Sequence, residues 1–417
     1  MSTQQETPVL PLDATEIEAV EESVLADLIG RMDVAATEEL TEGGSPARLV
    51  RVKTVDGTDQ VVKLLVDLPG AVDGHDLESF RVKIRQIEKV RRDVPELTDV
   101  YTGLSNEYYG DQWAAYTMPF YPNRDIAEPL RRGEDLGLHY EPELRTILGD
   151  LIGTGYLRER TATAPGNIAE VHGDRLARRF WLLQQYLPDE LTDAEHIVVN
   201  GVTCRNPLRL AQNIIDNPAL TARVDPAHLF YPVHGDLNTR NILVTDERRA
   251  AEGDGGYRII DPRGTLGPWD PAYDISKILF SFTVWDAGLR KGFDITESPV
   301  DGWRVGIRGG NYPGYVAAAH GLLPLLRTLP SFRELTRDDA GWESRYLLGH
   351  AFHLLGEAAC RLSDIKKRTD EEEDAALSPI DLATGHYLYG VLFLEDAVRQ
   401  LETAGTIDHE AALRHLV

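Results

Sequence analysis

The sequence has few cysteines and no pair of them that is spaced for metal binding. Its two cysteines, Cys204 and Cys360, lie far apart in a chain of 417 residues, and neither belongs to a Cys-x-x-Cys motif. The sequence therefore gives no support to a disulfide framework or a structural zinc site. Buried free thiols in a reducing compartment are expected instead.

Long hydrophobic runs and an excess of basic charge are also missing. No stretch of about 18 apolar residues occurs, and the N-terminal residues lack a basic start and a hydrophobic segment, so we expect a cytoplasmic protein without a membrane span. The 43 basic residues face 68 acidic ones, for a net charge of −25, which argues against nucleic acid or anionic membrane as partners. The acidic surface serves solubility, or it attracts a cationic substrate such as an amino sugar.

The most informative stretch reads VHGDLNTRNILV from Val233 to Val244, and RIIDPRG follows from Arg258 to Gly264. Phosphoryl transfer needs an oriented hydroxyl, a carboxylate that accepts its proton, and metal ions on the phosphates. Asp236 is the candidate for that carboxylate. Asn241 and Asp261 offer the hard oxygen ligands that Mg²⁺ prefers.

Two apolar runs place these motifs at strand ends. Strands are expected at Ile242 to Val244 and at Tyr257 to Ile260, joined by a turn within Asp246 to Gly256. This hairpin brings Asn241 and Asp261 near the same cation. The alternative is that HGD is only a polar turn, but the match of four residue types at these offsets favours a catalytic loop.

The two motifs resemble those of the aminoglycoside phosphotransferase and choline kinase-like superfamily, the small-molecule branch of the protein-kinase-like fold. The resemblance implies an α+β, two-lobed fold with a small antiparallel sheet and a mainly helical lobe, ATP or possibly GTP as donor, and Mg²⁺. Protein kinases carry Arg and Lys where this chain has Gly235 and Asn238, which favours a small-molecule acceptor. Pro262 and Arg263 differ from antibiotic kinases and resemble capsule- or sugar-pathway relatives.

The first part of the chain has the pattern of a nucleotide-binding lobe. A helix and three strands are expected, at Thr15 to Met32, Val34 to Leu40, Arg48 to Val55 and Asp59 to Val66. The turn with Gly43, Gly44 and Ser45 either approaches phosphates or is an ordinary turn, because it lacks the full GxGxxG pattern.

A lysine inside an apolar strand is the clearest feature of this lobe. Lys63 interrupts VVKLL, and the resemblance assigns it to the α- and β-phosphates, although an edge-strand lysine facing solvent is the alternative. The resemblance places the lysine's carboxylate partner on the next helix, Leu77 to Arg92. Glu78 is favoured for this role and Glu88 stays open.

A hinge-like segment, WAAYTMPFY, ends the first lobe. Backbone groups near Met118 and Phe120 are expected to bind adenine, with Met118 as core filler the alternative. We therefore predict a nucleotide-binding lobe at 1–119 and a lobe with the catalytic loops and substrate-binding helices at 120–417.

The second lobe is expected to be mainly helical. The expected helices are Pro142 to Leu157, Asp174 to Leu187, Trp342 to Leu362 and Thr384 to Leu401, and the turn signal Asn200-Gly201 falls in an extended stretch. The last two helices wall the acceptor pocket in the resembling family, and the charge run between them is expected to be exposed.

Several charged side chains are expected to support the two loops. Asp274 is expected to cap a helix and brace the catalytic loop, and His234, Arg240 and Arg263 to support the loops or contact phosphate. Lys277 either contacts substrate or faces solvent.

The sequence therefore predicts an ATP-dependent kinase that acts on a hydroxyl of a sugar, aminocyclitol, aminoglycoside or similar metabolite. A nucleotide-binding pseudokinase scaffold is the second hypothesis, which the joint presence of Lys63, Asp236, Asn241 and Asp261 disfavours. A protein kinase is the third, and the absence of an APE-like signature disfavours it.

Overall fold

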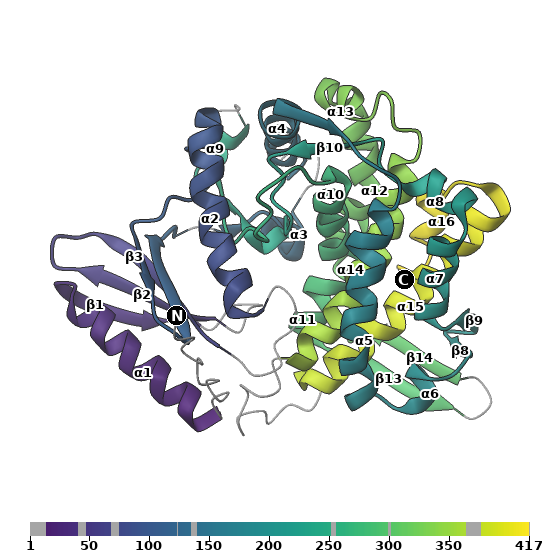
Figure 1. Ribbon diagram of the computed structural model, residues 1–417, viewed down its shortest axis with the longest axis horizontal. Helices are drawn as coiled ribbons and strands as arrows, with labels where there is room; N and C mark the ends of the chain where they lie inside the picture. The colour runs from purple at the N-terminus through teal and green to yellow at the C-terminus, as the bar shows by residue number, and fades with distance from the viewer. Residues whose placement is uncertain are drawn as a thin grey trace, which may run out of the picture.

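The computed structural model describes residues 14–40, 47–67, 75–122, 124–134, 140–251, 256–298, 302–363 and 377–416. A small antiparallel sheet with two helices forms one part, and a larger, mainly helical part lies beside it (Figure 1). This arrangement confirms the expected two-lobed α+β fold. Among these residues no helix is both long and apolar enough to cross a bilayer.

The first lobe is built on five antiparallel strands in the order β1-β2-β3-β5-β4. The strands are β1 (Val34–Glu39), β2 (Arg48–Thr54), β3 (Asp59–Val66), β4 (Asn106–Tyr109) and β5 (Trp113–Pro119). The predictions for the first three strands and for the hinge-side strand are confirmed to within two residues, whereas β4 was not predicted. Its two tyrosines are partly or largely exposed, so it lacks the apolar run that marks the other strands.

Helices cover both faces of this sheet. Helix α1 (Ala14–Gly30) packs against Val62, Leu64 and Val66, and helix α2 (Leu77–Asp93) packs against the opposite face. Because successive side chains of a strand alternate between faces, Lys63 belongs to the α2 face. The lysine is therefore directed into the space between the two lobes and not toward solvent.

The second lobe has its core around two long helices, α14 (Trp342–Ser363) and α15 (Pro379–Ala404). Gly390 lets them approach closely, since a Cβ there would lie 2.8 Å from Leu355 Cγ. Helices α5 (Asp174–Tyr186) and α10 (Pro271–Phe280) pack on α14. Around them lie α3 (Glu128–Arg132), α4 (Glu141–Asp150), α6 (Asp189–Thr192), α7 (Pro207–Asp216), α8 (Pro218–Val224), α11 (Asp286–Lys291), α12 (Pro313–Thr328), α13 (Pro330–Leu335) and α16 (His409–Ala412).

The predicted helices are present, but two of their ends differ from the prediction. The predicted helix 142–157 leaves α-helical geometry after Asp150 and continues as a π-helical turn, Leu151–Gly155, in a segment with two glycines. Helix α15 begins five residues earlier than predicted, because Ser378 caps it by accepting a hydrogen bond from Asp381 N. The charge run between α14 and α15 lies outside the described residues.

Three small sheets complete the second lobe. Strands β11 (Ile242–Val244) and β12 (Tyr257–Ile259) pair as predicted, but a short helix, α9 (Glu247–Ala251), lies in the connection that was predicted to be only a turn. These strands join β6 (Arg124–Asp125), and β7 (Glu159–Ala162) pairs with β10 (His228–Tyr231).

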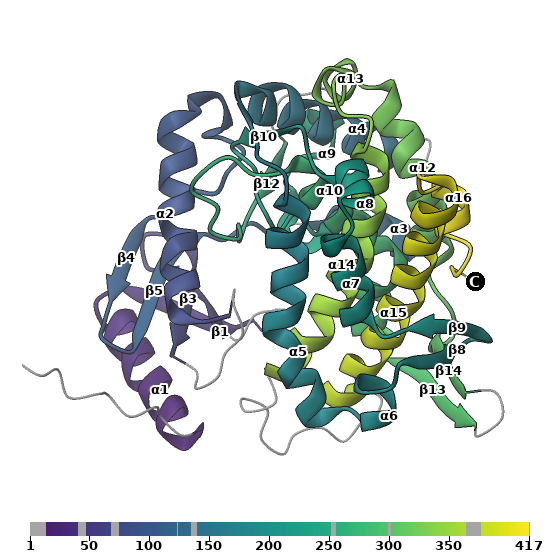
Figure 2. The same ribbon diagram turned by 45° about the vertical axis from the view of Figure 1, so that its right-hand side comes forward.

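The predicted Asn200-Gly201 turn joins β8 (His196–Val199) to β9 (Val202–Arg205), with φ of 49° and 78° at its two residues. A hairpin that was not predicted, β13 (Phe293–Ser298) and β14 (Gly302–Ile307), extends this pair into a four-stranded sheet beside α15 (Figure 2).

Candidate active site

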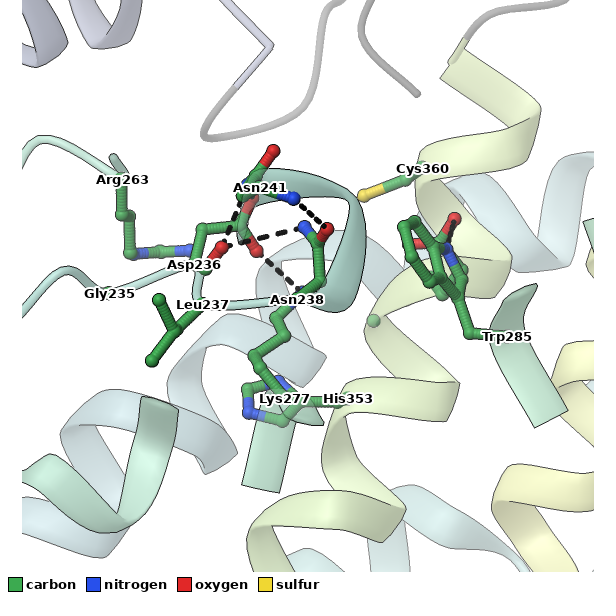
Figure 3. A network of polar contacts seen from close by, with 12 residues as sticks. Gly235, Asp236, Leu237, Asn238, Asn241, Arg263, Lys277, Trp285, His353 and Cys360 are labelled. Atoms are coloured by element: carbon green, nitrogen blue, oxygen red, sulfur yellow. Dashed lines mark hydrogen bonds and ion pairs between the residues drawn. The ribbon is translucent and has the colours of Figure 1, made fainter. Parts of the chain in front are cut away.

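The HGD motif lies on the loop between β10 and β11, and its Asp236 lines a cleft between the lobes. The Asp236 carboxylate is 3.0 Å from Lys277 Nζ, which comes from α10 (Figure 3). Burial raises the pKa of the Asp236 carboxyl, but the ammonium groups of Lys277 and Lys83 outweigh burial and lower it below its ordinary value. The structure therefore keeps this carboxylate ionised, as a proton acceptor must be.

Glycine is required at the centre of the motif. Gly235 has a φ of 82°, and a Cβ at this position would lie 2.8 Å from Arg263 Cβ. Both the backbone conformation and the space exclude larger residues. The Arg of protein kinases at this position could not be accommodated here without moving Arg263.

A buried carboxylate on α10 fixes the conformation of the loop. Asp274 accepts hydrogen bonds from the backbone N–H groups of His234 (2.9 Å) and Gly235 (2.7 Å) and from the Tyr156 hydroxyl (2.8 Å). Burial raises the pKa of Asp274 to about 7, although these donors act in the opposite direction. The expectation that Asp274 also caps the helix is wrong, because the helix begins earlier and Asp270 accepts the capping bond from Ala272 N.

His234 connects the catalytic loop to the second motif. Its Nδ1 accepts a hydrogen bond from Asp236 N at 3.3 Å, so the proton is on Nε2, which donates to the Ile260 carbonyl at 3.0 Å. Burial lowers the pKa of His234 to about 4. The neutral ring therefore holds Asp236 and Asp261 at a fixed separation, since Ile260 immediately precedes Asp261.

The two candidate metal ligands, Asn241 and Asp261, lie next to each other. Asn241 Nδ2 donates to the Asp236 carbonyl at 2.8 Å and lies 3.5 Å from the Asp261 carbonyl, which directs the amide oxygen away from both. Asp261 has a φ of 54°, a strained conformation for a residue with a side chain, and such strain is concentrated at functional positions.

The Asp261 carboxylate is held by two lysines. Its Oδ1 lies 2.9 Å from Lys63 Nζ and 3.4 Å from Lys83 Nζ. Burial raises the pKa of Asp261, but these two ammonium groups outweigh it and hold the pKa well below the ordinary range. An ionised carboxylate and an amide oxygen suit Mg²⁺, and since the described residues contain no cluster of three or more His, Cys, Asp or Glu, phosphates and water would complete the shell.

The predicted carboxylate partner of Lys63 is wrong. Glu78 is two-thirds exposed and pairs with Arg85 at 2.5 Å, and Glu88 shares a hydrogen bond with Glu107 that raises the pKa of Glu88. The helix instead turns Lys83 toward the cleft, because Lys83 lies one turn after the buried Phe80. The lysine of β3 therefore pairs with Asp261, and α2 adds a second cation in place of a carboxylate.

A fully buried glutamine ties α2 to both loops. Gln86 Nε2 donates to Thr265 Oγ1 at 2.8 Å and to the Val233 carbonyl at 2.9 Å. Its Oε1 accepts from Gly264 N at 2.5 Å and Thr265 N at 2.8 Å. One side chain of the first lobe thus fixes the segments before His234 and after Arg263.

The two residues predicted to lie near adenine, Met118 and Phe120, are placed differently. Met118 is buried and lines the cleft together with Leu49 and Ile260, which makes an apolar region beside Lys63. Phe120 N already donates to the Asp59 carbonyl at 3.0 Å, so this N–H is engaged in the sheet and is not available to a base. Gly43, Gly44 and Ser45 lie outside the described residues.

The cleft is lined by many charged side chains. Arg240 donates to the buried Asp286 carboxylate at 2.7 Å, and Arg263 donates to the Tyr273 hydroxyl at 3.1 Å, so both arginines flank the loops as expected. Sequence reasoning missed a larger set: Gln86 behind the loops, and on the cleft wall Lys83, Arg175, Arg179, Glu357, Cys360 and Arg361. The available signal was charged or polar residues at helical spacing within apolar stripes.

No family model matches the sequence, and no curated protein matches it. In structure the chain is similar to a proposed fructosamine-3-kinase from Haemophilus somnus 129PT, with 12% identity, a TM-score of 0.43, and coverage of 88% of this chain and 94% of that chain. It is also similar to an aminoglycoside-3'-phosphotransferase of type VIII, with 18% identity, a TM-score of 0.40, and coverage of 63% of this chain and 83% of that chain. A third similar structure is the MAP kinase LmaMPK10 from Leishmania major, with 12% identity, a TM-score of 0.28, and coverage of 96% of this chain and 92% of that chain. With identities and TM-scores this low, none of these likenesses assigns an activity or an acceptor to the chain.

Proposed function

We propose that the protein is a Mg²⁺-dependent small-molecule kinase. It transfers the γ-phosphate of ATP or GTP to a hydroxyl of a sugar, aminocyclitol, aminoglycoside or similar polar metabolite. The observation that supports this most is a pair of ionised carboxylates in one cleft, Asp236 beside Lys277 and Asp261 beside Lys63. A binding scaffold does not need two ionised carboxylates in one cleft, each paired with a lysine of its own.

The roles follow from the contacts. Asp236 orients the acceptor hydroxyl and receives its proton, while the acceptor oxygen bonds to the γ-phosphorus and the bond from that phosphorus to the β-phosphate oxygen breaks. Lys277 stands beside Asp236 and stabilises the anionic oxygens of the transferring group. Asp261 and Asn241 would hold Mg²⁺, which neutralises phosphate charge.

The position of Lys277 compensates for a missing loop residue. Protein kinases carry a lysine two positions after the catalytic Asp, and this chain has Asn238 there. Asn238 Oδ1 instead accepts from Arg240 N and Asn241 N, and so shapes the turn that leads to the metal ligand. The cation next to the catalytic carboxylate is supplied from α10.

The test is turnover of ATP and GTP by the purified protein with a panel of sugars, aminoglycosides and choline, with and without Mg²⁺. Asp236→Asn is expected to lower kcat at least about 100-fold without changing nucleotide affinity. Asp294→Asn, at an exposed position on β13, is the matched control and should retain full activity. Nucleotide binding without phosphorylation of any acceptor, or full activity of Asp236→Asn, would show that the protein is not this kinase.

A further inference from the structure

Helix α2 brings a second lysine to the carboxylate that is paired with the lysine of β3. Lys83 Nζ lies 3.4 Å from Asp261 Oδ1, and Lys63 Nζ lies 2.9 Å from the same oxygen. Among the residues that the structure describes, Asp261 is the only acidic residue paired with either ammonium group. One negative charge therefore faces two positive charges.

The neighbouring carboxylate does not remove this excess. Asp236 has a lysine of its own, since Lys277 Nζ lies 3.0 Å from Asp236 Oδ1. In this part of the described cleft lining, three ammonium groups thus face two carboxylates. The side chains of Lys63 and Lys83 are only 5% and 10% exposed, so water and salt screen the repulsion between them weakly. An anion that binds beside them lowers the free energy of the cluster.

Two contacts of α2 fix the direction of Lys83. Phe80 stacks on Tyr116 of β5, with 5.4 Å between the ring centroids. Gln86 is hydrogen-bonded to the segments on both sides of the loops, at the Val233 carbonyl and at Thr265. Lys83 is three residues from Phe80 and three from Gln86, so it lies between them on the helix surface. Packing on the sheet and on the loops therefore holds Lys83 toward the cleft before any ligand is bound.

An apolar region lies next to the two lysines. It is lined by Leu49, Met118 and Ile260, and Leu49 is paired with Lys63 in the sheet. A nucleotide whose base lies in this region would place its phosphates beside the two lysines, in the same cleft as Asp236. The ammonium group of lysine is a compact charge that binds phosphate oxygens.

We propose that Lys83 is a second phosphate-binding lysine for the donor nucleotide and acts beside Lys63. Its ammonium group contacts phosphate oxygens of the bound nucleotide and no longer shares Asp261 with Lys63. This inference rests on the proposed kinase activity and adds a donor-binding residue on α2, the helix on which a carboxylate partner of Lys63 was expected.

A different role for Lys83, as a counter-ion that only neutralises Asp261, predicts the opposite result. A counter-ion competes with the metal ion for the carboxylate, so its removal would leave the affinity for Mg²⁺-ATP unchanged or raise it. Removal of a phosphate-binding lysine lowers that affinity. The removal of an excess buried charge should also leave the unfolding temperature of the nucleotide-free protein unchanged or raise it.

The test measures the binding of ATP and of adenosine to the full-length protein by titration calorimetry in the presence of Mg²⁺. Lys83→Met is expected to weaken ATP binding about 10- to 100-fold and to leave adenosine binding unchanged, because adenosine carries no phosphate. Lys83→Arg keeps the charge and should restore part of the ATP affinity. Lys53→Met, at an exposed position on β2 of the same lobe, is the matched control and should bind ATP as the parent protein does.

An ATP affinity of Lys83→Met equal to or above that of the parent, or an equal loss for ATP and adenosine, overturns the phosphate-binding role and leaves the kinase activity standing. A parent protein that binds neither ATP nor GTP overturns both proposals. Thermal unfolding of each variant without nucleotide separates a binding effect from misfolding, and Lys83→Gln gives a second measurement if Lys83→Met does not fold.

Discussion

Replacing Gln86 with leucine tests whether this residue connects the two lobes. The side chain is fully buried, and leucine fills a similar volume but cannot form hydrogen bonds. The carbonyls of Val233 and His234 keep other donors, Thr265 Oγ1 and Arg263 N, after the change. The loss therefore falls on the N–H groups of Gly264 and Thr265, which are left without the Gln86 oxygen.

An unsatisfied buried N–H costs about 1–3 kcal/mol, and Gly264 is only partly buried, so we expect Gln86→Leu to lower the free energy of unfolding by about 2–4 kcal/mol. Urea unfolding followed by circular dichroism measures this change. Gln184→Leu is the control, because Gln184 is exposed and bonds only to Asp193 among the contacts described, and it should change stability by less than about 0.5 kcal/mol. A loss in Gln86→Leu no greater than that of the control would refute the reasoning.

Three further predictions address the catalytic loop and the cleft. Gly235→Ala should lose turnover and about 1–3 kcal/mol of stability, measured by kinetics and urea unfolding, while Gly321→Ala on α12, where a Cβ has open space, should be neutral or stabilising. Burial raises the pKa of Asp274 to about 7, so the stability that the protonated Asp274 contributes is present below about pH 4 and is lost as the pH rises through about 7. Asp274→Asn should remove this part of the pH dependence of unfolding, and an unchanged pH profile in the variant would contradict the prediction. Burial raises the pKa of the Cys360 thiol, but Arg179 and His75 outweigh burial and bring the pKa to about 6. Alkylation of Cys360 by iodoacetamide should therefore reach half its maximum rate near that pH, and Arg179→Gln should shift this midpoint upward. Cys204, whose pKa burial raises to about 12, should stay unmodified.

The proposed catalytic centre could be located from the sequence because its residues lie at short spacings. Asp236, Asn241 and Asp261 flank two strands of one hairpin, so local patterns alone place them together. The strand that carries Lys63 was found for the same reason, since a single charge in an apolar run marks the face of the strand on which that charge needs a partner.

The residues that were missed depend on contacts between distant segments. Lys83 meets Asp261 across 178 positions, and Arg179 meets Cys360 across 181. Their helices were predicted, but the rotation of each helix against its neighbours was not. A rotation of α2 about its axis by one residue determines whether a glutamate or Lys83 faces the cleft. The packing of Phe80 and Ile84 against the sheet fixes this rotation.

The pairing of Lys63 and Lys83 with one carboxylate has a thermodynamic consequence for the proposed kinase. A metal ion on the Asp261 carboxylate competes with two ammonium groups for its negative charge, and a bare ion offers those groups no anion in exchange. A metal already bound to a nucleotide brings phosphate oxygens that can receive the released lysines. Free Mg²⁺ should therefore bind weakly, and nucleotide and metal should each strengthen the binding of the other by the same factor.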